Sequence, residues 1–159
     1  MLSHVDENNQ AAMVDVSAKP PTRRTAHARA VVALPAAVAS LFRGGDIQSK
    51  KGPVFQTARI AGVMAAKKTS ELIPLCHPIG LEDCQIEIQL TAEREVIIDA
   101  RATVTHKTGV EMEALTAAMI AALTVYDMCK AVSHDIVIRE VRLIAKQGGK
   151  SDYHAATVA

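Results

Sequence analysis

The chain has 159 residues, 49% of them hydrophobic, which is enough for one folded domain with a sizeable core. A net charge of +1 and an aromatic content of 3% argue against a surface that neutralises many phosphates or stacks bases, so nucleic acid is not an expected partner. The three cysteines, Cys76, Cys84 and Cys129, are far apart and form no C-x-x-C motif, a usage typical of a reducing cytoplasm rather than of a disulfide framework or a zinc site.

The first 45 residues predict an arm, a strand and a short helix. Residues 1–12 are polar and lack the apolar core of a signal peptide, so we expect a flexible N-terminus and no export signal. The alternation in MVDVS indicates a short extended piece. In TRRTAHARAVVALP, alanine and valine alternate with basic residues, which predicts a strand over 24–33. AAVASLF then predicts a short helix, closed by Gly44 and Gly45.

The middle of the chain predicts a helix and a hairpin. The segment KKGPVFQTARIAGVMAAKK predicts a helix over 53–67, because proline suits the first helical position and the apolar residues Val54, Ala58, Ala61, Met64 and Ala65 fall on one stripe. After the loop LIPLCHP, the runs CQIEIQL and EVIIDARATVTH alternate around a polar break, which predicts an antiparallel hairpin.

A long helix is the next predicted element. Thr108 and Glu111 have the T-x-x-E spacing of a capping box, which predicts a helix from residue 109 or 110 to about residue 131. Its apolar run is too short to span a bilayer, and we expect a buried helix instead.

The faces of this helix predict its neighbours. We expect the stripe Met112, Leu115, Met119 and Leu123 to face the core, while alanine and threonine cover the opposite side. One sheet covers only one of two apolar faces, so the second predicts a subunit interface.

The last part of the chain predicts a strand over DIVIREVRLIAK and a glycine-rich tail, QGGKSDYH. Strands mixed with helices, one of the strand pairs a clear hairpin, indicate a two-layer α+β domain. We expect a single domain over 13–152, with flexible ends at 1–12 and 153–159.

Charges at the end of the long helix are the first candidates for chemistry. At about 100° per residue, Lys130 projects in the direction of Met112 and Leu123, and Asp127 lies about 60° away. The pair is either a solvated i, i+3 ion pair or a proton-transfer pair that lines a cleft. At the start of the helix, Glu111 and Glu113 either stabilise the helix end or bind a ligand.

Lysines near two glycine-containing segments are candidates for phosphate binding. Lys50 and Lys51 precede a predicted helix N-terminus, which indicates either an anionic ligand there or two solvated loop lysines. The tail AKQGGKSD is no P-loop, because Ile144 replaces the first required glycine. Its glycines still allow Lys146 and Lys150 to approach a phosphate.

The loop LIPLCHP is stiff because Pro74 and Pro78 restrict its backbone. The other histidines lack metal-ligand spacing, so no metal site is expected. Adjacent residues of an extended chain point to opposite sides, which argues against Cys76 and His77 as a nucleophile and its base. The loop is then either packed structure or the wall of a binding site.

Several long motifs in order carry a family resemblance. MVDVSAK, TARIAG, LIPLCHP, KTGVEMEALTAA, YDMCKAV and KQGGKSD span the chain from Met13 to Asp152. With them the chain resembles the cyclic pyranopterin monophosphate synthases, the molybdenum cofactor biosynthesis protein C family. The resemblance implies a ferredoxin-like two-layer α+β sandwich, with helices packed on one face of an antiparallel sheet. It also implies a cytoplasmic homohexamer, a trimer of dimers with active sites at the dimer interfaces.

The resemblance also implies a reaction. A phosphorus-oxygen lyase of this family converts 3′,8-cyclo-7,8-dihydroguanosine 5′-triphosphate to cyclic pyranopterin monophosphate and releases pyrophosphate. No resident cofactor is implied, although Mg²⁺ can accompany the triphosphate. The alternative from another class is a nucleotide-sensing module that binds phosphate on the same fold without catalysis.

Site residues follow from the matched motifs. The resemblance makes Asp127 the catalytic acid/base, Lys130 its charged partner, Lys51 a second catalytic lysine and His77 a further catalytic residue. It assigns substrate binding to Leu75, Cys76, His77, Glu111, Met112, Glu113 and Lys146, with Arg24, or its neighbour Arg23, as a phosphate ligand.

Overall fold

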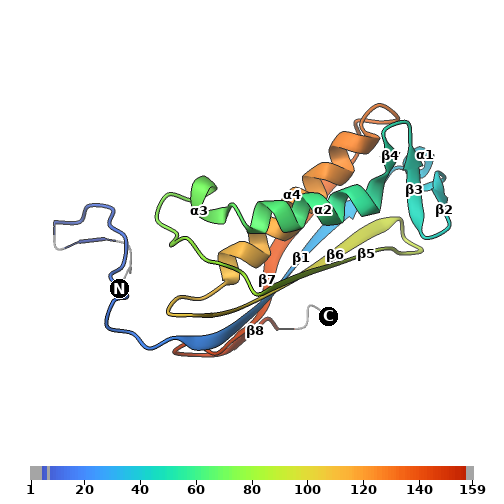
Figure 1. Cartoon of the computed structure of the whole chain (residues 1–159). Helices are drawn as coiled ribbons and strands as arrows, with labels where there is room; N and C mark the ends of the chain where they lie inside the picture. Colours follow the sequence, from blue (N-terminus) through green and yellow to red (C-terminus); the bar gives the residue numbers. More distant parts are fainter. Residues whose placement is uncertain (1–4, 7, 157–159) are drawn as a thin grey trace.

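The computed structural model describes residues 5, 6 and 8–156. Its elements, in chain order, are β1 (Thr22–Ala33), α1 (Ala36–Ala39), β2 (Phe42–Arg43), β3 (Asp46–Ser49), β4 (Gly52–Pro53), α2 (Val54–Ala66), α3 (Thr69–Leu72), β5 (Asp83–Leu90), β6 (Glu95–His106), α4 (Glu111–Cys129), β7 (Val137–Gln147) and β8 (Tyr153–His154). A five-stranded antiparallel sheet in the order β5-β6-β1-β7-β8 forms one layer, and α2 and α4 cover one face of it (Figure 1). The prediction of a ferredoxin-like two-layer α+β fold is confirmed.

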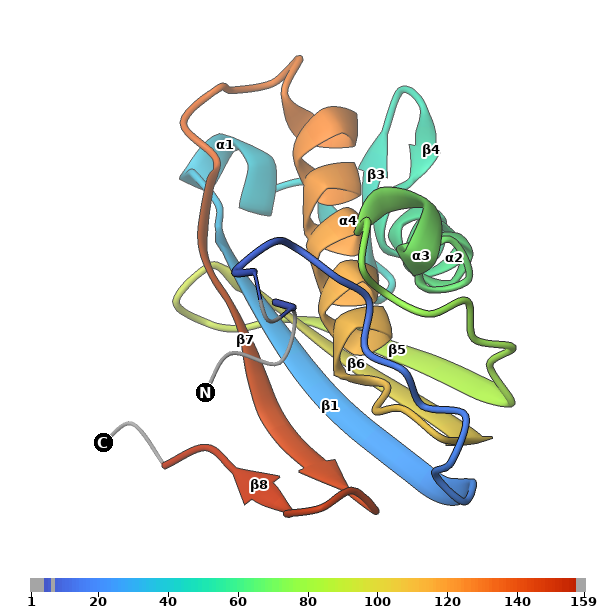
Figure 2. The same cartoon turned by 90° about the vertical axis from the view of Figure 1, so that its left-hand side faces the viewer.

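The predicted strands are confirmed where the sequence alternates. β1 lies at the centre of the sheet and pairs with β6 over its whole length and with β7 on its other side (Figure 2). Ala26, Ala28 and Ala30 face the helices and are fully or almost fully buried, whereas His27 and Arg29 lie on the opposite face. The period of two that the sequence shows is therefore the inside-outside alternation of a half-covered strand.

The two ends of the chain differ in part from the expectation. MVDVS belongs to no strand. Tyr153 and His154 form β8, which pairs with β7, so the sheet continues past the expected domain end at residue 152. Parts of both expected flexible ends, residues 1–4, 7 and 157–159, lie outside the described residues.

The face of α4 that packs on the core is the opposite of the predicted one. Six small residues on this face are fully buried: Ala114, Ala117, Ala118, Ala121, Ala122 and Val125. Of the predicted stripe, Met112, Met119 and Leu123 are 37%, 47% and 47% exposed, and only Leu115 is half-buried against the core. The prediction was wrong because α4 packs closely against both the alanine-rich β1 and α2, and only small side chains fit such an approach.

The same packing explains the apolar character of α4. By length and composition α4 could cross a membrane, but 56% of its apolar window is buried inside the protein. The prediction of a buried core helix is confirmed.

The predicted capping box does not form. α4 begins at Glu111 with Val110 at the N-cap, and no side chain caps it. The hydroxyl of Thr108 instead bonds Nδ1 of His106 at 2.9 Å, and the carboxylate of Glu111 pairs with Lys146. A start one or two residues later than expected leaves both side chains free for these partners.

Gly62 permits the contact between α2 and α4. A Cβ at this position would lie 2.4 Å from Cδ1 of Ile86 and 2.9 Å from the carbonyl oxygen of Ala117. These distances are too short for any real side chain, so the helix crossing requires glycine here.

We predict that Gly62→Ala lowers the free energy of unfolding by about 1 kcal/mol. Overpacking typically costs ~1–3 kcal/mol, more than the ~1 kcal/mol that alanine gains from helix propensity. Urea unfolding measures the change. Gly80→Ala is the matched control, because nothing lies within 4 Å of its Cβ position. A stabilised Gly62→Ala variant would contradict the close packing of these helices.

Candidate active site

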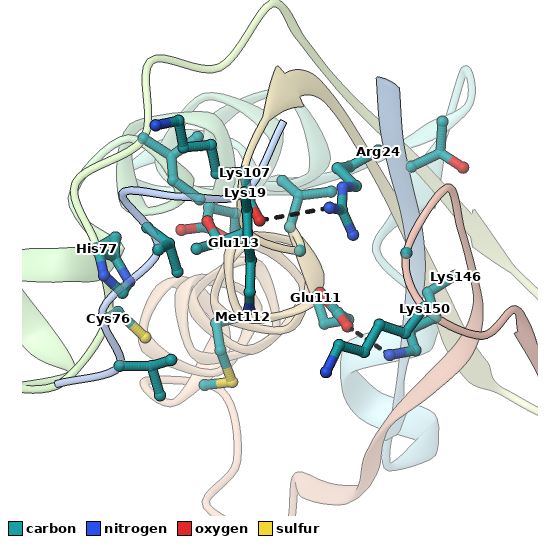
Figure 3. Close-up of a pocket in the computed structure, with 18 of the residues that line it drawn as sticks. Lys19, Arg24, Cys76, His77, Lys107, Glu111, Met112, Glu113, Lys146 and Lys150 are labelled. Carbon is teal, nitrogen blue, oxygen red and sulfur yellow. Dashed lines mark hydrogen bonds and ion pairs between the residues drawn. The ribbon is translucent and has the colours of Figure 1, made fainter. Parts of the chain in front are cut away.

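A cavity of about 520 Å³ opens at the N-terminal end of α4 (Figure 3). Five segments line it: the N-terminal arm around Val14 and Val16, β1 at Arg24 and Thr25, the loop from Leu75 to Ile79, the start of α4, and the end of β7 with the tail that follows it. Segments far apart in sequence therefore converge at one end of the two-layer fold.

The loop LIPLCHP forms one wall of this pocket, as one of its two interpretations predicted. Leu75, Cys76 and His77 all line the cavity and are half-buried. Burial first, and the nearby charge of Glu113 second, raise the pKa of the Cys76 thiol. A raised pKa keeps the sulfur protonated, so this cysteine is poorly suited to act as a nucleophile.

The two glutamates of the VEME motif lie in different surroundings within the pocket. Glu111 pairs with Lys146, Oε1 to Nζ at 2.9 Å, on the side of β7. Glu113 is only 3% exposed, and burial, with a smaller contribution from Glu111, raises the pKa of its carboxyl group. Glu111 is therefore a charged partner for a lysine, while Glu113 is able to hold a proton.

Arg24 stands on the opposite wall from Cys76 and His77 (Figure 3). Its guanidinium donates to the carbonyl oxygens of His106, at 3.4 Å, and Lys107, at 3.3 Å. Of the two arginines that the sequence left open, only Arg24 lines the cavity. Carbonyl partners leave its charge uncompensated, as an anion-binding residue requires.

Gly148 in the tail allows a close backbone contact with β1, in addition to the expected approach of the tail lysines to a ligand. A Cβ at Gly148 would lie 1.9 Å from the carbonyl oxygen of Arg23, so the tail packs directly on the backbone of β1. This approach brings Lys146 and Lys150 to the rim of the pocket.

Two pocket lysines, Lys19 and Lys107, were absent from the predicted site, whereas Lys150 was expected near a phosphate as part of the tail. Lys19, Lys107 and Lys150 line the cavity, and Lys107 Nζ donates to the carbonyl oxygen of Ser17 at 2.7 Å. Lys19 ends the motif MVDVSAK, and Lys107 begins KTGVEMEALTAA. Membership in these motifs was the signal that could have identified them, because an isolated lysine has no spacing pattern of its own.

A second cluster lies at the other end of α4. Asp127 forms two ion pairs: its Oδ2 lies 2.8 Å from Lys51 Nζ, and its Oδ1 lies 2.8 Å from Lys130 Nζ. Lys130 first, then Lys51, lowers the pKa of Asp127 to about 2, and Asp127 in turn raises the pKa of Lys130. All three side chains are about half exposed, so the i, i+3 pair is solvated and gains a third member from a distant loop.

The two groups of predicted site residues do not meet within one chain. Asp127 is 15 residues beyond Met112 on a continuous helix, and a rise of ~1.5 Å per residue separates them by roughly 22 Å. One chain thus has the pocket at one end of α4 and the charged cluster at the other.

The N-terminus of α2 is not an open anion site. The carboxylate of Asp46 accepts hydrogen bonds from the backbone amides of Phe55, at 2.7 Å, and Gln56, at 3.1 Å. The interpretation that Lys50 and Lys51 mark an anionic ligand at this helix end is therefore wrong, because the protein's own carboxylate occupies the end of the helix. Among the described residues, no three His, Cys, Asp or Glu side chains converge as a metal site would require.

We predict that Asp127 stays ionised down to about pH 2. Because the pKa of Asp127 is lower in the folded protein than its value of ~3.9 in the unfolded chain, the ion pairs contribute their full stability above that unfolded pKa. This stability is lost as the pH falls through the folded pKa. Carbon-13 NMR titration of the carboxyl group measures this. Lys130→Ala and Lys51→Ala should each raise the pKa toward 3.8, Lys130→Ala by more. Lys67→Ala, at an exposed position after α2, should leave it unchanged; equal titration in all four proteins would exclude the coupling.

Comparisons with known proteins show the family of the chain. The model of the MoaC family matches residues 13–149. A cyclic pyranopterin monophosphate synthase of Xanthomonas oryzae pv. oryzae is 52% identical over 157 residues, which cover 98% of this chain and 94% of the relative. A molybdenum cofactor biosynthesis bifunctional protein of Synechocystis is 46% identical over 156 residues, 96% of this chain and 45% of that longer protein. The chain belongs to the MoaC family.

Proposed function

We propose that this protein is a cyclic pyranopterin monophosphate synthase of molybdenum cofactor biosynthesis. It would convert 3′,8-cyclo-7,8-dihydroguanosine 5′-triphosphate to cyclic pyranopterin monophosphate and pyrophosphate, as a phosphorus-oxygen lyase. The observation that carries the proposal is the pocket, where Arg24, Lys146 and Lys150 stand across from the LIPLCHP wall (Figure 3) and the buried acid Glu113 lines the same cavity. Relatives that match nearly the whole chain have the name of this activity.

The cations of the pocket fit the phosphate end of the substrate. Formation of a cyclic phosphate leaves negative charge on the departing pyrophosphate, and positive side chains lower the energy of that charge. Arg24 and Lys107 bond only carbonyl oxygens in the contacts described, so both can exchange these partners for phosphate oxygens. Lys146 would leave Glu111 to do the same.

The buried acid Glu113 and the histidine His77 fit the ring end. Glu113, with its raised pKa, can donate a hydrogen bond to a ring acceptor or accept one from a ring N–H when ionised. His77 and Met112 line the same cavity, together with the Cys76 thiol, whose raised pKa keeps it uncharged.

The charged cluster fits the proton transfers. Opening and reclosing the rings requires protons to be moved, and both lysines are within 2.8 Å of an ionised carboxylate. Because the pKa of Asp127 is about 2, the carboxylate is a weak base while both lysines flank it. We assign it the role of orienting Lys51 and Lys130, which act as the proton donors, and of accepting a proton after one of them moves away.

A complete site would need a second copy of the chain. The roughly 22 Å between the pocket and Asp127 along α4 can be closed by an antiparallel neighbour, whose Asp127 end lies beside the pocket. Exposed apolar side chains on the outer surfaces of the helices supply surface for this contact: Met112, Met119 and Leu123 on α4, and Ile60 and Met64 on α2. Three such dimers would form the hexamer.

The remaining conditions follow from the chemistry. No step requires a redox cofactor, and Mg²⁺ would arrive with the triphosphate. The free thiols of Cys76, Cys84 and Cys129 suit a reducing cytoplasm.

We predict that Asp127→Asn and Lys51→Ala each lower turnover by roughly 10²-fold or more, because each removes a group from the proton transfers. Pyrophosphate release, with mass detection of the cyclic phosphate product, measures the rate. Lys67→Ala is the control for a lost surface lysine, and size-exclusion chromatography should find the oligomer intact. Normal turnover of both variants would overturn the site. Tight triphosphate binding without product in the unmodified protein would favour the sensing module instead.

We predict that two inactive variants restore activity when they assemble together. A mixed dimer of Asp127→Asn and His77→Ala has one site with both defects and one site with neither, because each site combines residues of two symmetric subunits. Random co-assembly should therefore recover about a quarter of the unmodified rate. A mixture of Asp127→Asn and Lys51→Ala should recover no activity, because both changes lie in the charged cluster and every site then has one defect. Failure of the first mixture would show that one chain holds the whole site.

A further inference from the structure

The small hairpin of β3 and β4, which carries Lys51, is held to the helices by a buried carboxylate. Asp46 begins β3 and is only 8% exposed. Its two carboxylate oxygens accept the backbone amides of Phe55 and Gln56, one amide each, at 2.7 and 3.1 Å. These amides belong to the first turn of α2, where a negative charge is favoured by the helix dipole. The hairpin is thereby fixed to the start of α2.

The turn between the two strands is also ordered by hydrogen bonds, so fixing Asp46 also fixes the backbone of Lys51. The hydroxyl of Ser49 accepts the backbone amide of Lys51 at 3.1 Å and donates to the carbonyl oxygen of Gly52 at 3.0 Å. Gly52 has a φ of 112°, which favours glycine. Only four residues separate Asp46 from Lys51, and the turn leaves the lysine backbone little freedom.

The position of the Lys51 ammonium depends on this support. Its side chain is 55% exposed, so core packing does not hold it. Its Nζ reaches Oδ2 of Asp127 at 2.8 Å and the carbonyl oxygen of the same residue at 3.3 Å. These contacts place the turn of the hairpin against the end of α4, where burial and, second, the charge of Asp46 raise the pKa of the Cys129 thiol to about 11.

We propose that Asp46 is a positioning residue for Lys51 in the reaction under Proposed function, on which this inference rests. Asp46 does not touch the pocket or the charged cluster. It fixes the hairpin so that the Lys51 ammonium meets Asp127 at the end of α4. A displacement of about 1 Å at a reacting group can lower a rate by ~10²-fold, so an anchor of this kind controls turnover.

The test is Asp46→Asn, which keeps the size of the side chain and removes one of the two amide acceptors. We expect kcat to fall by between tenfold and ~10²-fold, while KM stays within about twofold because the pocket lies at the other end of α4. We also expect the pKa of Asp127 to rise toward its usual range, as in Lys51→Ala. A carbon-13 titration detects that change independently of turnover.

Asp99→Asn is the matched control. Asp99 is also a buried carboxylate, 7% exposed, and it pairs with His27 and Arg29 on the face of the sheet away from the helices. It should lower stability without changing kcat or the titration of Asp127. Ser49→Ala, which loosens the same hairpin at its turn, should lower kcat in the same direction and serves if Asp46→Asn does not fold.

The outcomes separate the two proposals. If the unmodified protein does not turn over the substrate, the proposed function is wrong, and the titration of Asp127 still decides whether Asp46 holds Lys51. If the unmodified protein is active and Asp46→Asn keeps both its kcat and the low pKa of Asp127, the positioning role is wrong. An equal loss of kcat in Asp99→Asn would also overturn it, because general destabilisation would then explain the effect.

Discussion

The close packing of α4 on its alanine face is the constraint on which the rest of the molecule depends. Small side chains allow the helix to approach both the sheet and α2, and Gly62 removes the last obstacle at the crossing. A helix held so closely is a rigid rod of 19 residues, and it fixes the separation of the pocket and the Asp127 cluster. The helix dipole favours Lys51 and Lys130 at the carbonyl end, where Lys51 Nζ contacts the carbonyl oxygen of Asp127, and it favours Glu111 and Glu113 at the amide end.

Local patterns predicted the long strands and helices, but not the short elements β2, β3, β4, β8 and α3, and not which face of a helix is covered. The strands could be predicted because alternation reports burial on one side of a sheet, and the helix over 54–66 because its start and stripe are local. Met64 on that stripe is nevertheless 55% exposed, and large side chains of α4 such as Met119 and Leu123 are exposed too. Hydrophobicity favours burying the larger side chain, whereas close helix crossings favour the smaller. The choice between them depends on the size of residues in β1 and α2, which no window around α4 contains.

The candidate site was predictable to the extent that its residues are sequence neighbours or lie in long motifs. The i, i+3 spacing of Asp127 and Lys130 is a property of any helix, so their ion pair followed directly. Lys51 reaches the same carboxylate from 76 residues away, which only the fold can arrange. The prediction of an anionic ligand at the start of α2 failed for the same reason, because only the fold brings β3 to this helix end. Asp46 of β3 binds the free amides there, so the adjacent lysines need no external anion.

The charge of the pocket is the clearest case in which composition and structure answer different questions. A net charge of +1 describes the chain as a whole, because acids elsewhere balance the lysines, as Asp99 and Glu87 do for arginines on the open face of the sheet. Five positive side chains, Lys19, Arg24, Lys107, Lys146 and Lys150, line the cavity, and burial raises the pKa of Glu113, so this acid offsets less positive charge than an exposed carboxylate would. The near-neutral chain therefore argues against a long polyanion, which would need a charged surface. It does not argue against a single triphosphate, which needs only this local arrangement.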